Sequence, residues 1–279
     1  METVAIVGVG LIGASFGLAL RQSGFNGELI GVSSHSALAA GLARGAISTS
    51  ATLAEAAQRA DLIYLSQPVD RILETIAQLA ATLRPGTLVT DAGSTKEKIC
   101  ECALTHLPAG SFLGGHPIAG KEQRGPDAAD ADLFRNRPYI LTPGSAPAHH
   151  EAPFRAALNS FGATVLEMSP VEHDSTVAFT SHLPQLISTA LAATLYREDN
   201  AKLAQIFGPG LLGMTRLALS SPELWRSILS TNQAQVSEAL NAYIRVLREL
   251  QGTLGECEIS RTFEQATEFA HAIRKLPLT

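Results

Sequence analysis

The chain has 279 residues, 46% of them hydrophobic and 17% charged, which excludes an intrinsically disordered protein and allows two domains with cores of their own. Its formal net charge is -5, without basic tracts or basic stripes interleaved with aromatic residues, so we do not expect nucleic acid as a partner. A predicted strand begins close to Met1, which leaves no room for a signal peptide, and no apolar stretch reaches the roughly 18 residues of a membrane helix. We therefore expect no membrane association and a cytoplasmic location.

The first element is an apolar strand at residues 4–7, which leads into a G-x-G-x-x-G turn at residues 8–13 and then into a helix. In this context Gly8 permits the tight turn, Gly10 lets the backbone approach a pyrophosphate, and Gly13 lets the helix pack close to the strand. The phosphates would lie over the helix N-terminus. The pattern predicts a dinucleotide site formed by Gly8, Gly10, Leu11, Ile12 and Gly13.

Strands and helices alternate beyond this turn. Such alternation is typical of a doubly wound parallel sheet covered by helices on both faces. The predicted strands are 28–32, 61–65, 87–90, 112–114, 139–141 and 164–168, and the predicted helices between them are 37–43, 53–59, 69–83, 96–104 and 148–161. We therefore predict an α/β fold, a Rossmann-type domain over residues 1–168 followed by an all-helical domain over residues 169–279.

Cofactor choice depends on the end of the second predicted strand, where an NAD enzyme usually has Asp or Glu about 20 residues past the glycines. Here Ser33 stands at that position, followed by Ser34 and His35. These side chains do not repel a 2′-phosphate and can hydrogen-bond it, which favours NADP, with NAD as the alternative. Ligands bind beyond the carboxyl ends of the strands, so we also predict cofactor contacts after the next two strands, from Ser66, Gln67, Pro68 and Asp91.

Two segments at the same edge of the predicted sheet carry residues suited to proton transfer. The segment 91–96 contains Ser94, and the segment 114–120 contains His116 in a predicted loop between glycines. An imidazole titrates near neutral pH and suits a general base that removes a hydroxyl proton as hydride leaves the same carbon. We predict His116 as this base and Ser94 as the residue that orients its ring.

The helical domain begins at Ser169, with Pro170 and Glu172 completing a capping signature, and the first helix is predicted to continue to about residue 197. Pro184 lies inside it and should kink it, which allows the nearby His182 to turn into a cleft or to remain a satisfied core residue. His173 lies nine residues earlier and about half a turn out of phase with His182, which disfavours a metal site. We predict no metal.

Further along, Arg216 is the best candidate for an anion clamp, because its guanidinium can hold a carboxylate through two parallel bonds. A long helix is predicted to start at Pro222, and it includes Trp225, the single tryptophan, as a core or pocket residue. Its apolar positions 236, 240, 243, 247, 250 and 254 form one stripe, which indicates either intramolecular packing or a helix-helix dimer interface.

Taken together, these motifs resemble those of the prephenate and arogenate dehydrogenase family, the oxidative decarboxylases of tyrosine biosynthesis. The resemblance spans nearly the whole chain and rests on segments 7–15, 91–96, 114–120, 181–184, 215–216 and 222–225. It implies that His116 is the base for the ring hydroxyl and that Ser94 supports it near the nicotinamide. It also implies that His182 and Arg216 hold the substrate, that Trp225 lines the pocket, and that the helical domain joins two subunits into a homodimer.

The chain departs from the family pattern at Lys121, which stands where a small hydroxyl residue is common and which favours the keto acid side chain of prephenate over the ammonium of arogenate. The serine at the end of the second strand resembles NADP-using arogenate dehydrogenases and keeps arogenate open as the substrate. Two alternatives remain. One is another two-domain dehydrogenase, of the β-hydroxyacid or imine type, and the other is a non-catalytic nucleotide-sensing dimer.

Overall fold

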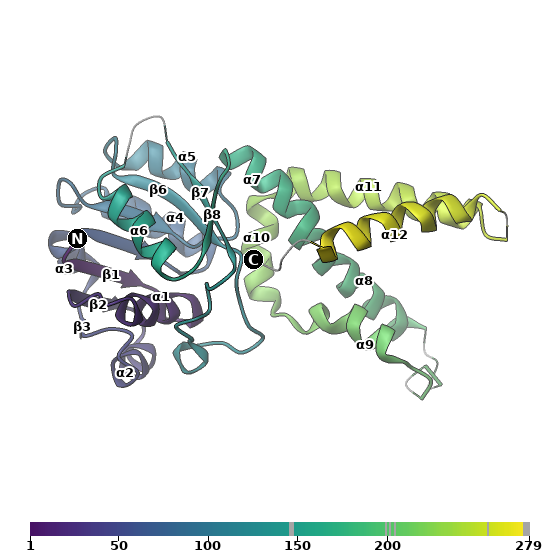
Figure 1. The fold of residues 1–279 in the computed structure, drawn as a ribbon, viewed down its shortest axis with the longest axis horizontal. Helices are drawn as coiled ribbons and strands as arrows, with labels where there is room; N and C mark the ends of the chain where they lie inside the picture. The colour runs from purple at the N-terminus through teal and green to yellow at the C-terminus, as the bar shows by residue number, and fades with distance from the viewer. Residues whose placement is uncertain (145–147, 199, 201, 204, 256, 276–279) are drawn as a thin grey trace. The chain divides into compact units, whose positions relative to one another are not determined.

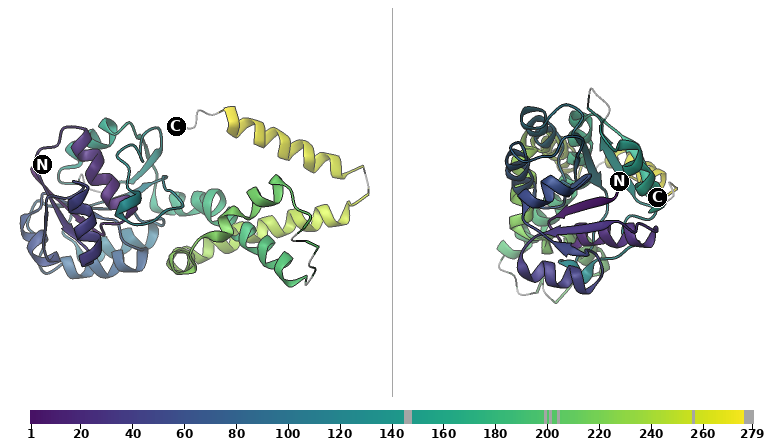
Figure 2. Two further views of the ribbon diagram at one scale, coloured as in Figure 1. Left: turned by 90° about the horizontal axis from the view of Figure 1, so that it is seen from below. Right: turned by 90° about the vertical axis from the view of Figure 1, so that its left-hand side faces the viewer.

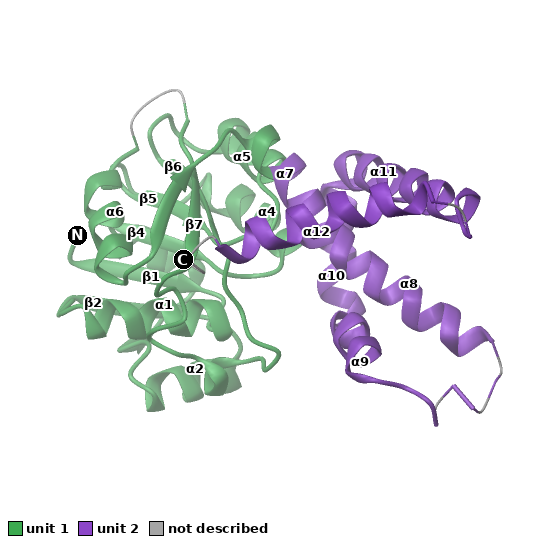
Figure 3. Cartoon of the chain, turned by 45° about the vertical axis from the view of Figure 1, so that its right-hand side comes forward, with its two compact units in different colours: residues 1–173, 277–279 green, residues 174–276 purple. Residues whose placement is uncertain are grey.

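The computed structural model describes residues 1–144, 148–198, 200, 202–203, 205–255 and 257–275 (Figure 1). Its contacts divide the described chain into two compact units, residues 1–173 and residues 174–275 (Figure 3). The division comes a few residues after the boundary predicted at 168/169, because the first turns of helix α7 (Pro170–Val177) have their contacts in unit 1.

Unit 1 is built on a sheet of eight strands in the order β3-β2-β1-β4-β5-β6-β7-β8. All neighbouring pairs are parallel except β6 with β7, which are antiparallel. The first six strands have the order expected of a dinucleotide-binding domain. The strands are β1 (Thr3–Val7), β2 (Glu28–Val32), β3 (Thr49–Ser50), β4 (Leu62–Leu65), β5 (Leu88–Asp91), β6 (Phe112–Pro117), β7 (Pro138–Thr142) and β8 (Thr164–Glu167).

Helices cover both faces of this sheet (Figure 2). The strands are apolar on both sides, and successive side chains alternate between two cores: Val4 and Ile6 pack into one, Ala5 and Val7 into the other. Residues of α1 and α6 complete the first core, and residues of α3, α4 and α5 complete the second. The helices are α1 (Leu11–Gln22), α2 (His35–Ala43), α3 (Leu53–Arg59), α4 (Val69–Leu79), α5 (Glu97–His106), the 3₁₀ turn η1 (Pro126–Ala128) and α6 (Glu151–Ser160).

The structure corrects one prediction that concerns the site. Strand β6 does not end at Gly114 but continues to Pro117, so His116 lies in a strand and not in a loop. The first part of β6 pairs with β5, whereas the part from Gly114 onward pairs with the antiparallel β7, in which Ile140 lies opposite His116. His116 is thus held by a backbone ladder beyond the carboxyl end of β5.

Unit 2 is helical in all of its described elements. The helix predicted over 171–197 is interrupted by a π-helical turn directly before Pro184, which is where the missing proline N–H disturbs the ladder. The helix predicted from Pro222 is in fact two helices that meet at Asn232. Beyond α7, the elements are η2 (Ala178–His182), α8 (Leu183–Arg197), α9 (Pro209–Thr215), η3 (Arg216–Leu219), α10 (Pro222–Thr231), α11 (Gln233–Gly252) and α12 (Ile259–Lys275).

The predicted fold class, a Rossmann-type sheet followed by a helical domain, is confirmed. The predicted helix bounds agree to within a few residues in unit 1, and the two-residue strand β3 was not predicted. Within the described residues, none of the helices combines the length and the apolar character needed to cross a lipid bilayer.

Candidate active site

The glycine turn after β1 has the geometry that its sequence predicts. Gly8 has a φ of +96°, in the left-handed region, and its N–H donates to the carbonyl of Val32 at 2.9 Å. A Cβ on Gly13 would collide with the carbonyl oxygen of Gly8 and with Ser66 Oγ, so only glycine lets α1 pack this close to the strand. A Cβ on Gly10 would meet nothing within 4 Å, and Gly10 provides no side-chain cap for α1. The first turn of α1 can therefore receive an anion.

A cavity of about 780 Å³ opens at this turn, within the size range of small-molecule sites. It brings together seven of the residues predicted for the cofactor, Gly8, Gly10, Ser33, Ser34, Ser66, Gln67 and Pro68, and its lining also includes Val9, Val32, Ala37, Arg71, Gly125 and Pro126.

The other residues predicted for the cofactor lie beside this lining. Leu11 and Ile12 pack their side chains against the core of unit 1, and Gly13 is buried against β1, so these three can offer a ligand backbone groups. His35 begins α2 with an exposed side chain.

Two polar residues of the cavity support its walls. Ser66 donates its hydroxyl to the carbonyl of Gly8 at 2.8 Å, which holds the glycine turn against the end of β4. Gln67 accepts a hydrogen bond from Thr75 Oγ1 at 2.9 Å, which directs its amide along α4. Both side chains therefore shape the pocket besides lining it.

The sequence analysis did not predict Arg71 as a site residue. Ser33 and Ser34 follow β2, whereas Arg71 lies on the helix that follows β4, and the two segments come together only because β1 pairs with both strands. Arg71 lies on α4, three residues past Pro68, and pairs with Glu74 at 2.8 Å in an exposed ion pair. The hydrogen bond that Arg71 donates to Glu74 raises the pKa of the guanidinium. A cation thus stands in the same cavity as the two serines.

Asp91, which we predicted to contact the cofactor, is fully buried and has no surface for a ligand. Its carboxylate pairs with the buried Lys96 and accepts the N–H groups of Gly93 at 2.8 Å and Gly115 at 3.1 Å. Lys96 also donates to the carbonyl of Gly115 at 2.6 Å. The pair thereby holds both backbone groups of the residue that precedes His116. These contacts tie Gly115 of β6 to the end of β5.

His116 is half-buried, and its Nδ1 lies 2.8 Å from Nε2 of His173, with the two rings edge to face at 67°. His173 is fully buried and is the fourth residue of α7, at the end of its first turn. Ser94 is half-buried before α5, and the described hydrogen bond of the His116 ring goes to His173 and not to Ser94. Sequence reasoning considered His173 only as a metal ligand, since nothing local connects it with a residue 57 positions away.

Lys121, predicted to select the substrate side chain, pairs with Asp130 at 2.8 Å on the surface of unit 1. The hydrogen bond from Lys121 lowers the pKa of that carboxyl group. The backbone N–H of Asp130 in turn donates to Ser15 Oγ of α1 at 2.9 Å. Lys121 therefore has a structural partner in a segment that packs on the nucleotide-binding helix.

In unit 2, His182 is buried at the end of the π-helical turn. Its Nδ1 lies 3.3 Å from Asn232 Nδ2, and its ring meets the ring of Trp225 edge to face at 5.8 Å. An amide nitrogen can only donate, so Nδ1 accepts and Nε2 carries the proton of the neutral ring. Asn232 also donates to the carbonyl of Asp174 at 2.8 Å, which explains the break between α10 and α11.

Arg216, the predicted anion clamp, begins η3 with an exposed side chain. Two buried polar residues of α8 hold the backbone that follows it: Gln185 donates to the carbonyl of Leu217 at 2.8 Å, and Ser188 accepts the N–H of Ala218 at 3.1 Å. The sequence analysis did not single out Gln185 and Ser188. Their polar side chains in an otherwise apolar stretch of α8 were a signal that they have buried hydrogen-bond partners.

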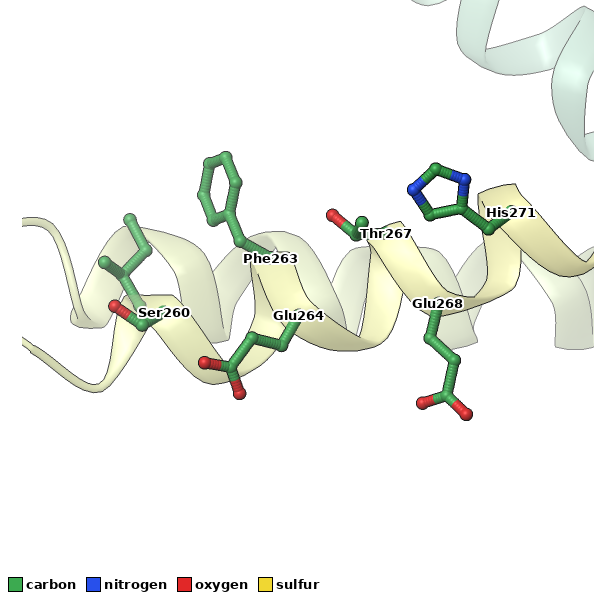
Figure 4. A pocket seen from close by; sticks show the side chains of 7 residues that line it. Ser260, Phe263, Glu264, Thr267, Glu268 and His271 are labelled. Atoms are coloured by element: carbon green, nitrogen blue, oxygen red, sulfur yellow. The ribbon is translucent and has the colours of Figure 1, made fainter.

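A second hollow, of about 730 Å³, lies along α12. Figure 4 shows Phe263, Thr267 and His271 along one side of the helix and Glu264 and Glu268 along another. All of its lining residues come from this single helix, so the hollow has no opposing wall in the described chain. It is a helix face and not a pocket for a small molecule.

Comparison with known families gives a match over most of the chain. The family profile described as the nucleotide-binding domain of prephenate dehydrogenase matches residues 16–167, and the profile described as its dimerization domain matches residues 169–268. The prephenate dehydrogenase of Bacillus subtilis (strain 168) is 33% identical over 258 residues, which are 90% of this chain and 69% of that protein.

Solved structures show the same similarity. Prephenate dehydrogenase from A. aeolicus, in complex with hydroxyphenyl propionate and NAD+, has a TM-score of 0.90 and 30% identity, with 98% of each chain covered. Synechocystis arogenate dehydrogenase has a TM-score of 0.82 and 33% identity, with 97% of this chain and 99% of that chain covered.

Proposed function

The chain belongs to the prephenate dehydrogenase family, and we propose that it catalyses the nicotinamide-dependent oxidative decarboxylation of prephenate or arogenate. The observation that carries this proposal is the cavity at the glycine turn, whose lining contains most of the residues predicted for a dinucleotide. It occurs in a chain that matches both domains of the family, which sets aside the other two-domain dehydrogenases considered from the sequence.

We propose that His116 is the base of this reaction. The substrate is a cyclohexadiene with a carboxylate on the ring carbon opposite the one that bears the hydroxyl. The nicotinamide, when bound, supplies the hydride acceptor. His116 takes the hydroxyl proton, the C–O bond gains double-bond character, and the hydrogen on the same carbon leaves as hydride. The carboxylate then leaves as carbon dioxide, its bonding electrons complete the aromatic ring, and the electrons of the carbonyl group return to its oxygen, which takes the proton back from His116 to give a phenol.

Because aromatisation drives the reaction, the protein has to position the substrate and supply one base. We propose that Arg216 holds a substrate carboxylate through its guanidinium, that His182 donates a hydrogen bond from Nε2, and that Trp225 forms an apolar wall. The buried contacts of His182 with Asn232 and Trp225 support this proposal, because they fix the ring in one orientation. The A. aeolicus protein binds hydroxyphenyl propionate, a phenol with a carboxylate side chain, which agrees with such a site.

For the cofactor we propose a preference for NADP over NAD. Ser33 provides no carboxylate to repel a 2′-phosphate, and Arg71 lines the same cavity as Ser33 and Ser34. A guanidinium and two hydroxyls are suited to a phosphate monoester. The A. aeolicus relative holds NAD+, so the preference follows from this chain's own residues and not from that neighbour.

We further propose that the protein is a homodimer through its helical domain. The predicted stripe runs along α11 and ends just beyond it; it is buried at Val236, half-buried at Leu240, Tyr243 and Leu250, and exposed at Leu247 and Leu254. Its first part therefore packs within unit 2, and its last part remains for a second subunit. The family profile that matches this unit is that of a dimerization domain.

The test is turnover of prephenate and of arogenate, each with NADP and with NAD, by the wild-type protein and by His116→Asn. We expect prephenate, arogenate or both to be oxidised. We expect His116→Asn to lower kcat by about 100-fold or more, the usual scale for a positioned base, with unchanged dinucleotide affinity. His149→Asn, which changes an exposed histidine of the same unit, should have wild-type activity. Dinucleotide binding without oxidation of either substrate would instead indicate the nucleotide-sensing alternative, and equal turnover by His116→Asn would remove His116 from the mechanism.

A further inference from the structure

The hydrogen bond between His116 and His173 is a contact that the proposed function does not use. Two imidazoles 2.8 Å apart share one proton, because one ring nitrogen must donate and the other must accept. His173 has no exposed surface, so this nitrogen of His116 meets a fixed partner and not exchanging water. The direction of this hydrogen bond therefore determines which nitrogen of His116 carries its proton.

Both histidines are anchored by their own backbones. The N–H of His173 donates to the carbonyl of Ser169 at 2.9 Å, and Ser169 Oγ accepts the N–H of Glu172 at 3.2 Å, which caps the start of α7. On the other side, His116 is paired within β6 and β7, and Gly115 is held by Asp91 and Lys96. With both main chains fixed, the Nδ1–Nε2 contact also fixes the plane of the His116 ring.

A base needs an unprotonated nitrogen, and with Nδ1 hydrogen-bonded to His173 the proton must be taken by Nε2. This requires Nδ1 to carry the hydrogen of the neutral ring and to donate it. We propose that His173 is the positioning residue of the base: its Nε2 accepts from Nδ1–H of His116 and so keeps His116 in the tautomer whose Nε2 can receive a proton. The inference rests on the proposed function only in naming His116 as the base.

The same contact acts when the base becomes charged. As Nε2 of His116 receives the substrate's hydroxyl proton, the ring becomes an imidazolium with hydrogens on both nitrogens. Nδ1–H remains hydrogen-bonded to Nε2 of His173, whose lone pair stabilises the new charge. A partner that could only donate at this position would favour the wrong tautomer and repel the imidazolium.

The tautomer can be measured directly in the full-length protein by ¹⁵N NMR of its eight histidines, with the His116 signals identified by their loss in His116→Asn. We expect neutral His116 to carry its hydrogen on Nδ1. In His173→Leu, which removes the acceptor, we expect the hydrogen to move to Nε2, the tautomer that isolated imidazoles favour. A hydrogen on Nε2 in the wild-type protein overturns the proposal. This measurement needs only His116→Asn to fold, for the identification of the signals, and it does not depend on any substrate being turned over.

Kinetics provide the second readout. His173→Leu should lower kcat by about 10- to 100-fold, the usual scale for loss of a partner that orients an imidazole, with unchanged dinucleotide affinity. His173→Gln places an amide oxygen near the former Nε2 and should recover most of this loss, which a packing defect would not show. Equal losses in both variants with the tautomer unchanged would overturn the proposal. If the wild-type protein turned over neither substrate, the proposed function would be rejected. The NMR measurement would then decide whether His173 fixes the tautomer of His116.

Discussion

Lys96 carries a charge into the interior of unit 1, where it pairs with Asp91 and has no exposed surface. Removing one member of such a pair typically costs about 3–5 kcal/mol, whereas replacing both with apolar residues can be neutral, so stability alone does not explain the pair. Its geometry does, since the two side chains hold the N–H and the carbonyl of Gly115. We infer that this pair fixes the backbone from which His116 extends.

Arg71 is the residue on which the cofactor preference can be tested. Arg71→Gln removes the cation but keeps a polar side chain, and it should weaken NADP binding by about tenfold, the scale of one charge-assisted hydrogen bond at an exposed site. NAD binding should change little, because NAD has no 2′-phosphate. The measurement is the Kd of each dinucleotide by fluorescence titration at two salt concentrations.

Arg59→Gln is the matched control, because Arg59 forms an exposed ion pair with Glu28 in the same unit and does not line the cavity. It should leave both Kd values unchanged. If Arg71→Gln weakened NAD and NADP equally, Arg71 would contact a part common to both dinucleotides, and the basis for an NADP preference would be lost.

At the scale of elements, the predictions succeeded where a local pattern decides the structure. The apolar runs and the glycine turn predicted β1, β2 and α1 closely, because burial and backbone conformation there follow from neighbouring residues. The extension of β6 and the break at Asn232 depend on partners far away in the chain, namely β7 in the first case and Asp174 and His182 in the second. The contact of His116 with His173 has the same origin, and no spacing in the sequence indicates it.

Two glycines of the turn at residues 8–13 allow effects on stability to be distinguished from effects on dinucleotide binding. Gly13→Ala should destabilise the protein by about 1–3 kcal/mol, because its Cβ would collide with the Gly8 carbonyl and Ser66. Gly10→Ala should leave stability unchanged, because its Cβ meets nothing within 4 Å of the protein, but it should weaken dinucleotide binding by about tenfold or more through collision with a pyrophosphate. Urea unfolding and dinucleotide titration of the two variants measure both effects. Unweakened binding by Gly10→Ala would place the phosphates elsewhere.

At the scale of the whole molecule, the two units differ in how much of their apolar surface they bury by themselves. In unit 1 the strands and helices enclose two extensive cores. In the described part of unit 2, the buried apolar cluster consists of Ala178, Val236 and Ala239, with three half-buried neighbours. Large side chains such as Leu247, 45% exposed, and Phe269, 67% exposed, remain accessible on α11 and α12. A surface of this kind is expected to bind a partner.

The dimer proposed for the family's dimerization domain can be tested on this surface. Leu247→Glu combined with Phe269→Glu should convert a dimer into a monomer, because two carboxylates on each subunit would have to be buried without partners. Leu104→Glu, at an even more exposed apolar residue on α5 of unit 1, should leave the dimer intact. Light scattering coupled to gel filtration gives the masses. A monomeric wild-type protein would contradict the proposal, and so would a dimer that persists in the double variant, since the exposed apolar residues of α11 and α12 would then need another explanation.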